Sequence, residues 1–155
     1  MTQSSPRVPL ARLLAMAFRQ LIDQLHERLA AAGYRDVRST YGYVLLAVRD
    51  HQTTGADIAL LLGVSKQAAS KLVDEMERGG YVKRQPHGDD ARAKSIAITS
   101  RGRRFLGVVE SIYDDLEEEW SHVMGRKRLE EMRSDLRQVV EVAHGGKLPA
   151  VRPTR

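Results

Sequence analysis

Apolar residues recur every three or four positions in several stretches of the chain, which is the period of an amphipathic helix. The first stretch, residues 9–33, carries leucines at 10, 14, 21, 25 and 29 and is followed by Gly33, a common helix stop. A short apolar helix is predicted at 43–48. Long helices are predicted after Thr99 and over 127–144, so that helices occupy 105–144. We therefore predict a mainly α-helical fold with long helices at both ends.

The segment 54–78 has the pattern of two short helices joined by a tight turn. Thr54 and Asp57 have the spacing of an N-terminal capping box, and Gly63 suits a left-handed C-cap. Ser65 can cap a second helix, Lys66 to about Arg78, which Gly79 and Gly80 end. This arrangement predicts a helix-turn-helix, a motif that places its second helix in the major groove of DNA.

Two alternating segments follow the second helix and predict a β-hairpin. Residues 81–85 and 94–99 have strand-like alternation, and Pro86 and Gly88 between them are turn formers, which puts the hairpin tip at 87–92. Residues 78–104 contain eight Lys/Arg against two acids, and this local excess is larger than the formal net charge of +5 for the whole chain. A basic hairpin beside a helix-turn-helix predicts a winged helix-turn-helix, at about 38–104, that follows the phosphate backbone.

The candidate DNA contacts lie on the second helix and on the hairpin. On the second helix they are Ser65, Lys66, Gln67, Ser70 and Lys71, which can reach base edges and phosphates in the major groove. On the hairpin, Lys83, Arg84, His87 and Lys94 are expected to contact phosphates. Arg92 is expected to enter a minor groove. Asp90 is expected to hold Arg92 or a neighbouring arginine by an ion pair. An ordinary solvated helix and a merely solubilising hairpin are the alternatives.

The segment DDARAKSIAITSRG resembles the wing of the multiple-antibiotic-resistance regulator (MarR) family. The shared positions are Asp90, Arg92, Lys94, Thr99 and Gly102. Ile98 replaces the usual Leu, and Ala91 stands where many members have a second Arg, which suggests a weaker wing. The preceding LLGVSKQAASKLVDEMERGGYVKR resembles the recognition helix and following strand of the same family, and the resemblance covers roughly residues 10–143.

The resemblance implies a homodimer that binds a pseudo-palindromic double-stranded DNA operator. The helices at 9–33 and 105–144 would interlock with those of a second copy, placing two recognition helices about one helical turn apart. Family members commonly bind an anionic aromatic effector between the dimerisation helices and the winged module. The residues expected to face such a cleft are Arg19, His26, Tyr41, Tyr43 and Arg49, each of which is equally compatible with a surface or packing role.

The composition restricts the remaining possibilities. With 155 residues, 42% hydrophobic and 29% charged, the chain suits one globular domain, predicted at 9–144, with flexible tails at 1–8 and 145–155. It has no cysteine, so disulfides, thiolate zinc sites and cysteine redox sensing are excluded. We expect no cofactor or metal: the acidic run 110–119 lacks histidines at ligand spacing and is interpreted as a solvated helix face. The first residues lack a signal-peptide pattern, so a cytoplasmic location without membrane contact is expected.

Two functions remain. The five histidines lie apart from any nucleophile and from one another, and the chain has no glycine-rich phosphate loop, so we do not expect an enzyme. The first hypothesis is a homodimeric transcriptional regulator, a repressor controlled by a small-molecule ligand. The alternative is a winged-helix adaptor that binds an acidic protein without sequence-specific DNA binding. Steep salt dependence and a preference among duplex sequences would distinguish the first from the second.

Overall fold

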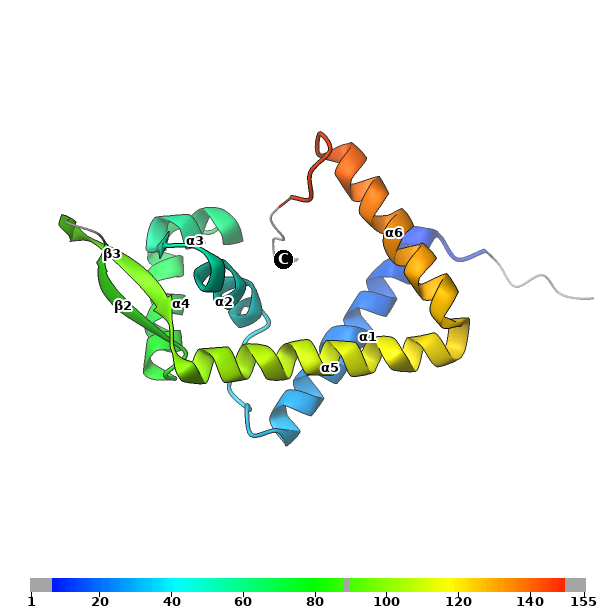
Figure 1. Cartoon of the computed structure of the whole chain (residues 1–155), viewed down its shortest axis with the longest axis horizontal. Helices are drawn as coiled ribbons and strands as arrows, with labels where there is room; N and C mark the ends of the chain where they lie inside the picture. The colour runs from blue at the N-terminus through cyan, green and yellow to red at the C-terminus, as the bar shows by residue number, and fades with distance from the viewer. Residues whose placement is uncertain (1–6, 88–89, 150–155) are drawn as a thin grey trace, which may run out of the picture. The chain divides into compact units, whose positions relative to one another are not determined.

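The computed structural model describes residues 7–87 and 90–149, and the side chains of 87 and 90–93 lie outside the described part. In chain order its elements are α1 (Leu10–Ala31), α2 (Thr40–Asp50), β1 (Thr53–Thr54), α3 (Gly55–Leu62), α4 (Lys66–Arg78), β2 (Val82–His87), β3 (Asp90–Ile98), α5 (Ser100–Met124) and α6 (Arg126–Ala143) (Figure 1). The prediction of a mainly helical fold with a small β wing is confirmed. Within the described residues no helix is both long enough and apolar enough to cross a bilayer.

The chain forms two compact units, Met1–Asp36 and Val37–Arg155. The first unit contains α1, which has an uneven apolar stripe. Leu25 and Leu29, near its C-terminal end, are buried, whereas Leu10 and Leu14, on the same predicted stripe, are exposed. The helix ends through Gly33, whose φ of 95° permits the Tyr34 N–H to donate to the Leu29 carbonyl at 2.8 Å.

The second unit contains a three-stranded antiparallel sheet in the order β1-β3-β2. The sequence predicted only the two strands of the hairpin. The third, β1, has just two residues, too few to show alternation, and pairs Thr53 with Ile96. The predicted tip at 87–92 is also too long, since β2 reaches His87 and β3 begins at Asp90. Pro86 lies within β2 rather than in the turn, which is tolerated because β2 is an edge strand.

Three aromatic rings form the centre of the second unit. Tyr41 of α2, Tyr81 before β2 and Phe105 of α5 are all buried and meet edge to face, with ring centroids 5.2–6.5 Å apart. Because each ring comes from a different part of the chain, the cluster fixes α2 and α5 relative to the start of the hairpin. Ile58 of α3 and Met76 of α4 are completely buried, which connects the two helices of the predicted motif to this core.

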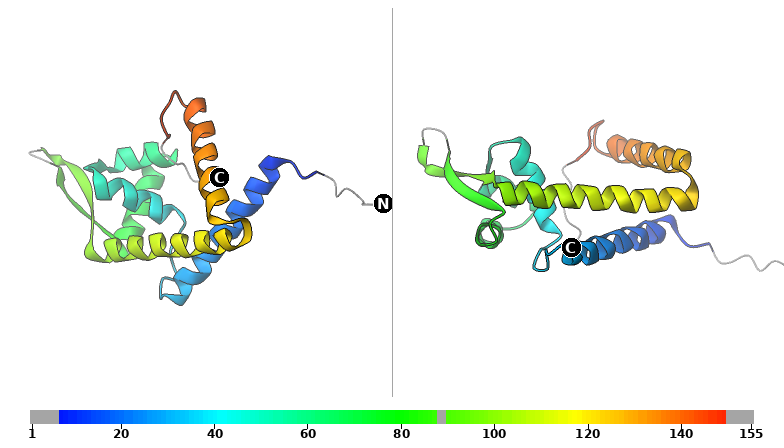
Figure 2. Two further views of the ribbon diagram at one scale, coloured as in Figure 1. Left: turned by 45° about the vertical axis from the view of Figure 1, so that its right-hand side comes forward. Right: turned by 60° about the horizontal axis from the view of Figure 1, so that its bottom comes forward.

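The long helix α5 turns into α6 at Gly125, which has a φ of 91° (Figure 2). Ion pairs connect the two helices: Arg126 Nη2 lies 2.7 Å from Glu118 Oε2, and Arg133 Nη2 lies 2.5 Å from Glu117 Oε2. Both glutamates belong to the acidic run 110–119, for which the sequence predicts a solvated helix face. Their side chains are partly exposed, but they serve as partners for arginines of α6.

Candidate nucleic-acid interface

The helix-turn-helix begins and ends as the local sequence signals predict. The Asp57 N–H donates to Thr54 Oγ1 at 3.3 Å, and the Thr54 N–H donates to Asp57 Oδ2 at 2.8 Å, so the capping box of α3 is complete. Gly63 ends α3 with a φ of 65°. Ser65 then caps α4, its Oγ accepting the Ala68 N–H at 3.1 Å. These caps set the direction in which α4 leaves the turn.

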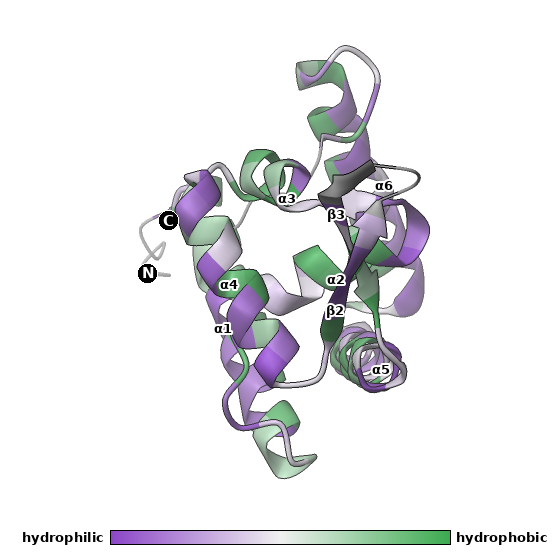
Figure 3. Cartoon of the chain, turned by 90° about the vertical axis from the view of Figure 1, so that its left-hand side faces the viewer, coloured by the Kyte–Doolittle hydropathy of each residue, from purple (hydrophilic) through white to green (hydrophobic). Residues whose placement is uncertain are grey.

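Helix α4 is strongly amphipathic, and the residues predicted to contact DNA lie away from its buried face. Its buried face consists of Ala69, Leu72, Val73 and Met76. The residues predicted to touch DNA at its N-terminal end are all exposed: Ser65, Lys66, Gln67, Ser70 and Lys71. Figure 3 shows hydrophilic and hydrophobic bands alternating along this helix. The first turn holds no acidic residue, so the positive end of the helix dipole and two lysines face solvent together.

The hairpin presents its two described lysines on opposite faces. In the β2–β3 register Lys83 pairs with Ala97 and Arg84 pairs with Ile96. Lys94 pairs with Pro86, two positions along the ladder from the Arg84–Ile96 pair. Side chains alternate across a sheet, so Lys94 shares a face with Arg84 and Lys83 lies on the other face. Both lysines are exposed. The side chains of His87, Asp90 and Arg92 lie outside the described part of the structure, so their predicted roles stay predictions.

Arg84, predicted as a phosphate contact, is directed toward α4. Its Nη1 lies 2.6 Å from Asp74 Oδ1 and 3.3 Å from Glu77 Oε1, and its Nη2 donates to the Ser70 carbonyl at 3.3 Å. The side chain is 24% exposed. It reaches α4 from strand β2, and its two terminal guanidinium nitrogens are bonded to carboxylates and to a carbonyl of the same chain.

Sequence reasoning overlooked two arginines that support this surface. Arg38, just before α2, donates to Glu75 of α4 at 3.0 Å. Arg101, at the start of α5, places its guanidinium carbon 5.0 Å from the centroid of the Tyr81 ring, a cation–π distance. Neither contact has a local sequence signal, because the partners are 37 and 20 residues away. The sequence shows an excess of arginine near the predicted recognition helix. It does not show which of these arginines contact residues of the same chain.

The hydroxyl of Thr99 joins the hairpin to α5. It accepts the Gly102 N–H at 3.0 Å as the N-cap of α5, and it lies 2.5 Å and 3.0 Å from the carbonyl oxygens of Gly80 and Tyr81. Gly102 is buried against the Tyr81 carbonyl, where there is no room for a side chain. The Thr and Gly of the predicted wing motif therefore fix the base of the hairpin.

The five residues predicted to face an effector cleft have different environments. Tyr41 is part of the aromatic core, where burial raises its pKa, and Arg49 donates to Asp50 and Glu110 at 3.0 Å and 2.9 Å. Tyr43 is half-buried on the same helix as Tyr41, and its proximity adds to the effect of burial in raising the pKa of Tyr113. These three residues lie on α2, and Arg49 lines a hollow together with Gln85 of β2 and Ser95 of β3.

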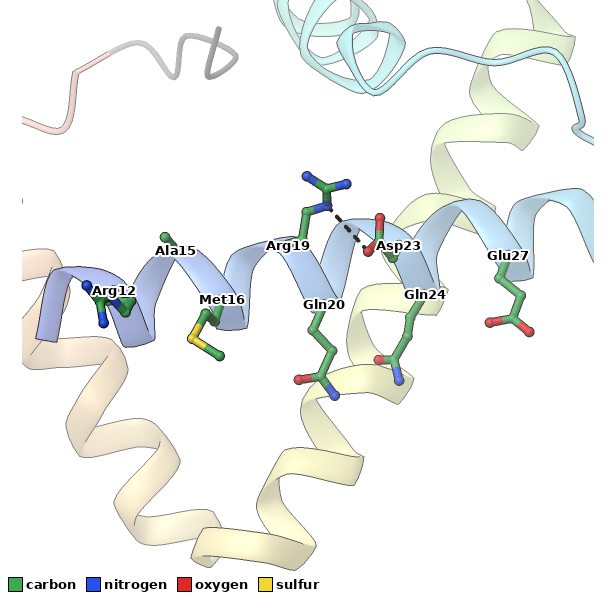
Figure 4. A pocket seen from close by; sticks show the side chains of 8 residues that line it. All are labelled: Arg12, Ala15, Met16, Arg19, Gln20, Asp23, Gln24 and Glu27. Carbon is green, nitrogen blue, oxygen red and sulfur yellow. Dashed lines mark ion pairs between the residues drawn. The ribbon is translucent and has the colours of Figure 1, made fainter. Parts of the chain in front are cut away.

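The other two predicted effector contacts lie on α1. Arg19 is exposed in a shallow groove along the helix, where it forms an ion pair with Asp23 at 3.5 Å (Figure 4). His26 is half-buried, one turn from Asp23. All the residues that line the groove belong to α1, and most of them have polar or charged side chains, with Met16 as the large apolar one.

Comparison with known proteins agrees with this architecture. Residues 36–93 match the model of the MarR family. The HTH-type transcriptional regulator PrsX of Escherichia coli is 29% identical over 117 residues, covering 74% of this chain and 69% of PrsX. The transcriptional repressor MprA of Escherichia coli K12 is 25% identical over 113 residues, covering 72% of this chain and 64% of MprA.

Solved structures of the same family share the fold. The reduced form of MarR from E. coli superposes with a TM-score of 0.73 at 22% identity, covering 88% of this chain and 99% of MarR. MepR from S. aureus, solved as a DNA complex, gives a TM-score of 0.67 at 22% identity with the same coverages. These relatives are transcriptional regulators and not enzymes. With its capped helix-turn-helix and its wing, the chain is similar over residues 36–93 to the MarR family, and it has the fold of MarR and MepR.

Proposed function

We propose that this protein is a homodimeric transcriptional repressor that binds a pseudo-palindromic site in double-stranded DNA. The observation that carries the proposal is the exposed, acid-free N-terminal half of α4, with Lys66, Gln67, Ser70 and Lys71 in one patch beside a basic hairpin. Lysines and the helix dipole attract phosphates, and the glutamine and serine can form hydrogen bonds with base edges. The structure of MepR with DNA and the name of the repressor MprA support the same role.

The dimer is proposed from apolar surface that a single chain leaves uncovered. On α1, Leu10 is 69% exposed, and Leu13, Leu14, Met16 and Phe18 are exposed as well. On α6, Leu129 is buried, but further along the same stripe Leu136 and Val139 are exposed. Apolar stripes of this length are favourable only when covered, and a second copy with the same two stripes can cover them symmetrically.

Control by a small anionic aromatic effector is part of the proposal. A ligand can change DNA affinity only by binding one dimer conformation more tightly than the other. The predicted contacts that remain available for it are Arg19, His26 and Tyr43, since Tyr41 is part of the core and Arg49 is paired with carboxylates. A cytoplasmic location follows from the regulatory role.

The test is selection of random duplex DNA by the purified protein at near-physiological salt, followed by affinity measurements on the enriched sequence. A two-fold symmetric motif with half-sites about one turn apart is expected. Lys71→Gln should weaken binding and lower the slope of log affinity against log salt by about 0.9, the value for one lost phosphate contact. Lys127→Gln, the same change on exposed α6, is the matched control and should alter neither quantity.

Selection that enriches no motif, together with tight binding to an acidic protein, would favour the adaptor hypothesis. A motif without two-fold symmetry would contradict the dimeric arrangement while leaving DNA binding in place.

A further inference from the structure

The C-terminal half of α4 carries three carboxylates in four residues. Asp74, Glu75 and Glu77 follow the lysines of the same helix, so the proposed recognition helix has three basic and three acidic residues. Unpaired carboxylates next to phosphates would weaken DNA binding through like-charge repulsion. The structure shows that all three are paired with arginines of the same chain.

Arg84 forms ion pairs with two of these carboxylates, those of Asp74 and Glu77. Its Nη1 lies 2.6 Å from Asp74 Oδ1 and 3.3 Å from Glu77 Oε1. The backbone N–H of Arg84 donates to the other oxygen of Glu77 at 2.8 Å. The second guanidinium nitrogen, Nη2, lies 3.3 Å and 3.4 Å from the carbonyl and hydroxyl oxygens of Ser70, one turn earlier on α4. One strand residue is thus bonded to three turns of the helix.

Arg38, from a different part of the chain, is paired with the third carboxylate, that of Glu75. Its Nη2 lies 3.0 Å from each of the two oxygens of Glu75, whose side chain is only 20% exposed. Arg38 precedes α2, whereas Arg84 lies in β2, so charged hydrogen bonds connect α4 to two separate parts of the second unit. Charge-assisted hydrogen bonds from a planar guanidinium restrict direction as well as distance.

We propose that Asp74, Glu75 and Glu77 are internal counter-ions through which Arg38 and Arg84 set the orientation of the recognition helix. Arg84 is then a positioning residue for α4 and not a phosphate contact. Its charge neutralises carboxylates that would otherwise repel DNA, and its fork geometry fixes the angle between α4 and the wing. This inference rests on the proposed DNA-binding function and assigns part of its specificity to contacts that never touch DNA.

The decisive variant is Arg84→Lys, measured on the selected duplex and on an unrelated duplex across a range of salt concentrations. Lysine keeps the charge but cannot bond Asp74, Glu77 and Ser70 together. A positioning role predicts that the ratio of specific to non-specific affinity falls about tenfold, the effect of losing one good hydrogen-bonded contact, with the salt slope unchanged. A phosphate-contact role predicts near wild-type binding for Arg84→Lys.

A second comparison tests the counter-ions. The double variant Asp74→Asn/Glu77→Gln removes two negative charges, so simple repulsion from phosphate predicts tighter binding to every duplex. The positioning role predicts a loss of specificity similar to that of Arg84→Lys, and no further loss when the two changes are combined, because they break the same contacts. Circular dichroism confirms that each variant is folded at the temperature used.

Opposite results would overturn the inference. One is an Arg84→Gln variant that loses affinity equally for both duplexes, with a salt slope lower by about 0.9. The other is an Asp74→Asn/Glu77→Gln variant that binds both duplexes more tightly. Failure of the proposed function is distinguishable, since the wild-type protein would then show no preference between the two duplexes.

Discussion

Gly102 provides a direct test of how the wing is attached to α5. A Cβ built at this position would overlap the Tyr81 carbonyl oxygen and would lie 2.9 Å from Ile98 Cγ1 and 3.1 Å from the Tyr81 carbonyl carbon. Two of these three atoms belong to the backbone. The same carbonyl accepts the Thr99 N–H at 3.1 Å, so it cannot move away without losing a buried hydrogen bond. We therefore expect Gly102→Ala to be destabilising although it lies in a helix.

The size of the effect follows from two opposing contributions. Overpacking a buried site costs about 1–3 kcal/mol, while replacing glycine by alanine in a helix gains up to about 1 kcal/mol. After a helix-propensity gain of about 1 kcal/mol is subtracted, the net loss is up to about 2 kcal/mol, which lowers the Tm of a chain of this length by up to about 8 °C. Gly107 is the matched control, because it lies in the same helix with no heavy atom within 4 Å of the added Cβ. Gly107→Ala should raise the Tm by about 2–4 °C, since only the helix-propensity gain remains.

Thermal unfolding followed by circular dichroism at one fixed protein concentration measures both variants. The fixed concentration is needed because the stability of the proposed dimer would depend on the protein concentration. Opposite signs at the two glycines are the expected result. A Gly102→Ala variant that melts at or above the wild-type temperature would show that the Tyr81 segment moves without loss of stability and that its close approach does not restrict this position.

Three further predictions concern other parts of the structure. Thr99→Val removes the N-cap of α5 and the hydroxyl contacts with the hairpin, so it should cost about 1–2 kcal/mol in thermal unfolding; an unchanged Tm would contradict the role of the hydroxyl. Burial raises the pKa of Tyr41 above its ordinary value of 10.0. The contribution of the neutral phenol to the free energy of unfolding is therefore complete below pH 10 and is lost as the pH rises through the raised pKa. Tyr41→Phe should therefore lose Tm less steeply than wild type above pH 10, and identical slopes would exclude this contribution. Leu14→Asp on the exposed stripe of α1 should shift sedimentation from dimer toward monomer, whereas an unchanged dimer would place the interface elsewhere.

The elements of the helix-turn-helix were predictable because their signals are local. The capping box of Thr54 and Asp57, the left-handed Gly63 and the N-cap Ser65 each act within three or four residues of a helix end, and each has the predicted geometry. Helix α4 begins and ends where the apolar period and its flanking residues indicate. Within such short distances the type of residue nearly determines the partner.

The partners of the arginines were not predictable for the opposite reason. Arg38 and Glu75 are 37 residues apart, and Arg84 and Asp74 are 10 residues apart across a helix end and a turn. A count of basic residues in the wing treats Arg84 and Lys83 as equivalent, but the register of β2 and β3 puts them on opposite faces of the sheet. The short β1 strand was missed because two residues carry no period.

The distribution of paired and unpaired charge explains why α4 can serve as a recognition helix although its formal charge is zero. All three of its carboxylates are paired with Arg38 or Arg84, whereas Lys66 and Lys71 are exposed at the other end. The field toward solvent is therefore positive at the N-terminal end, where the helix dipole adds to it. An ordinary solvated helix would leave its acids free to interact with its own lysines at a spacing of three or four residues. Here Lys71 and Asp74 have that spacing, but the carboxylate of Asp74 lies 2.6 Å from Arg84, which leaves Lys71 available for a phosphate.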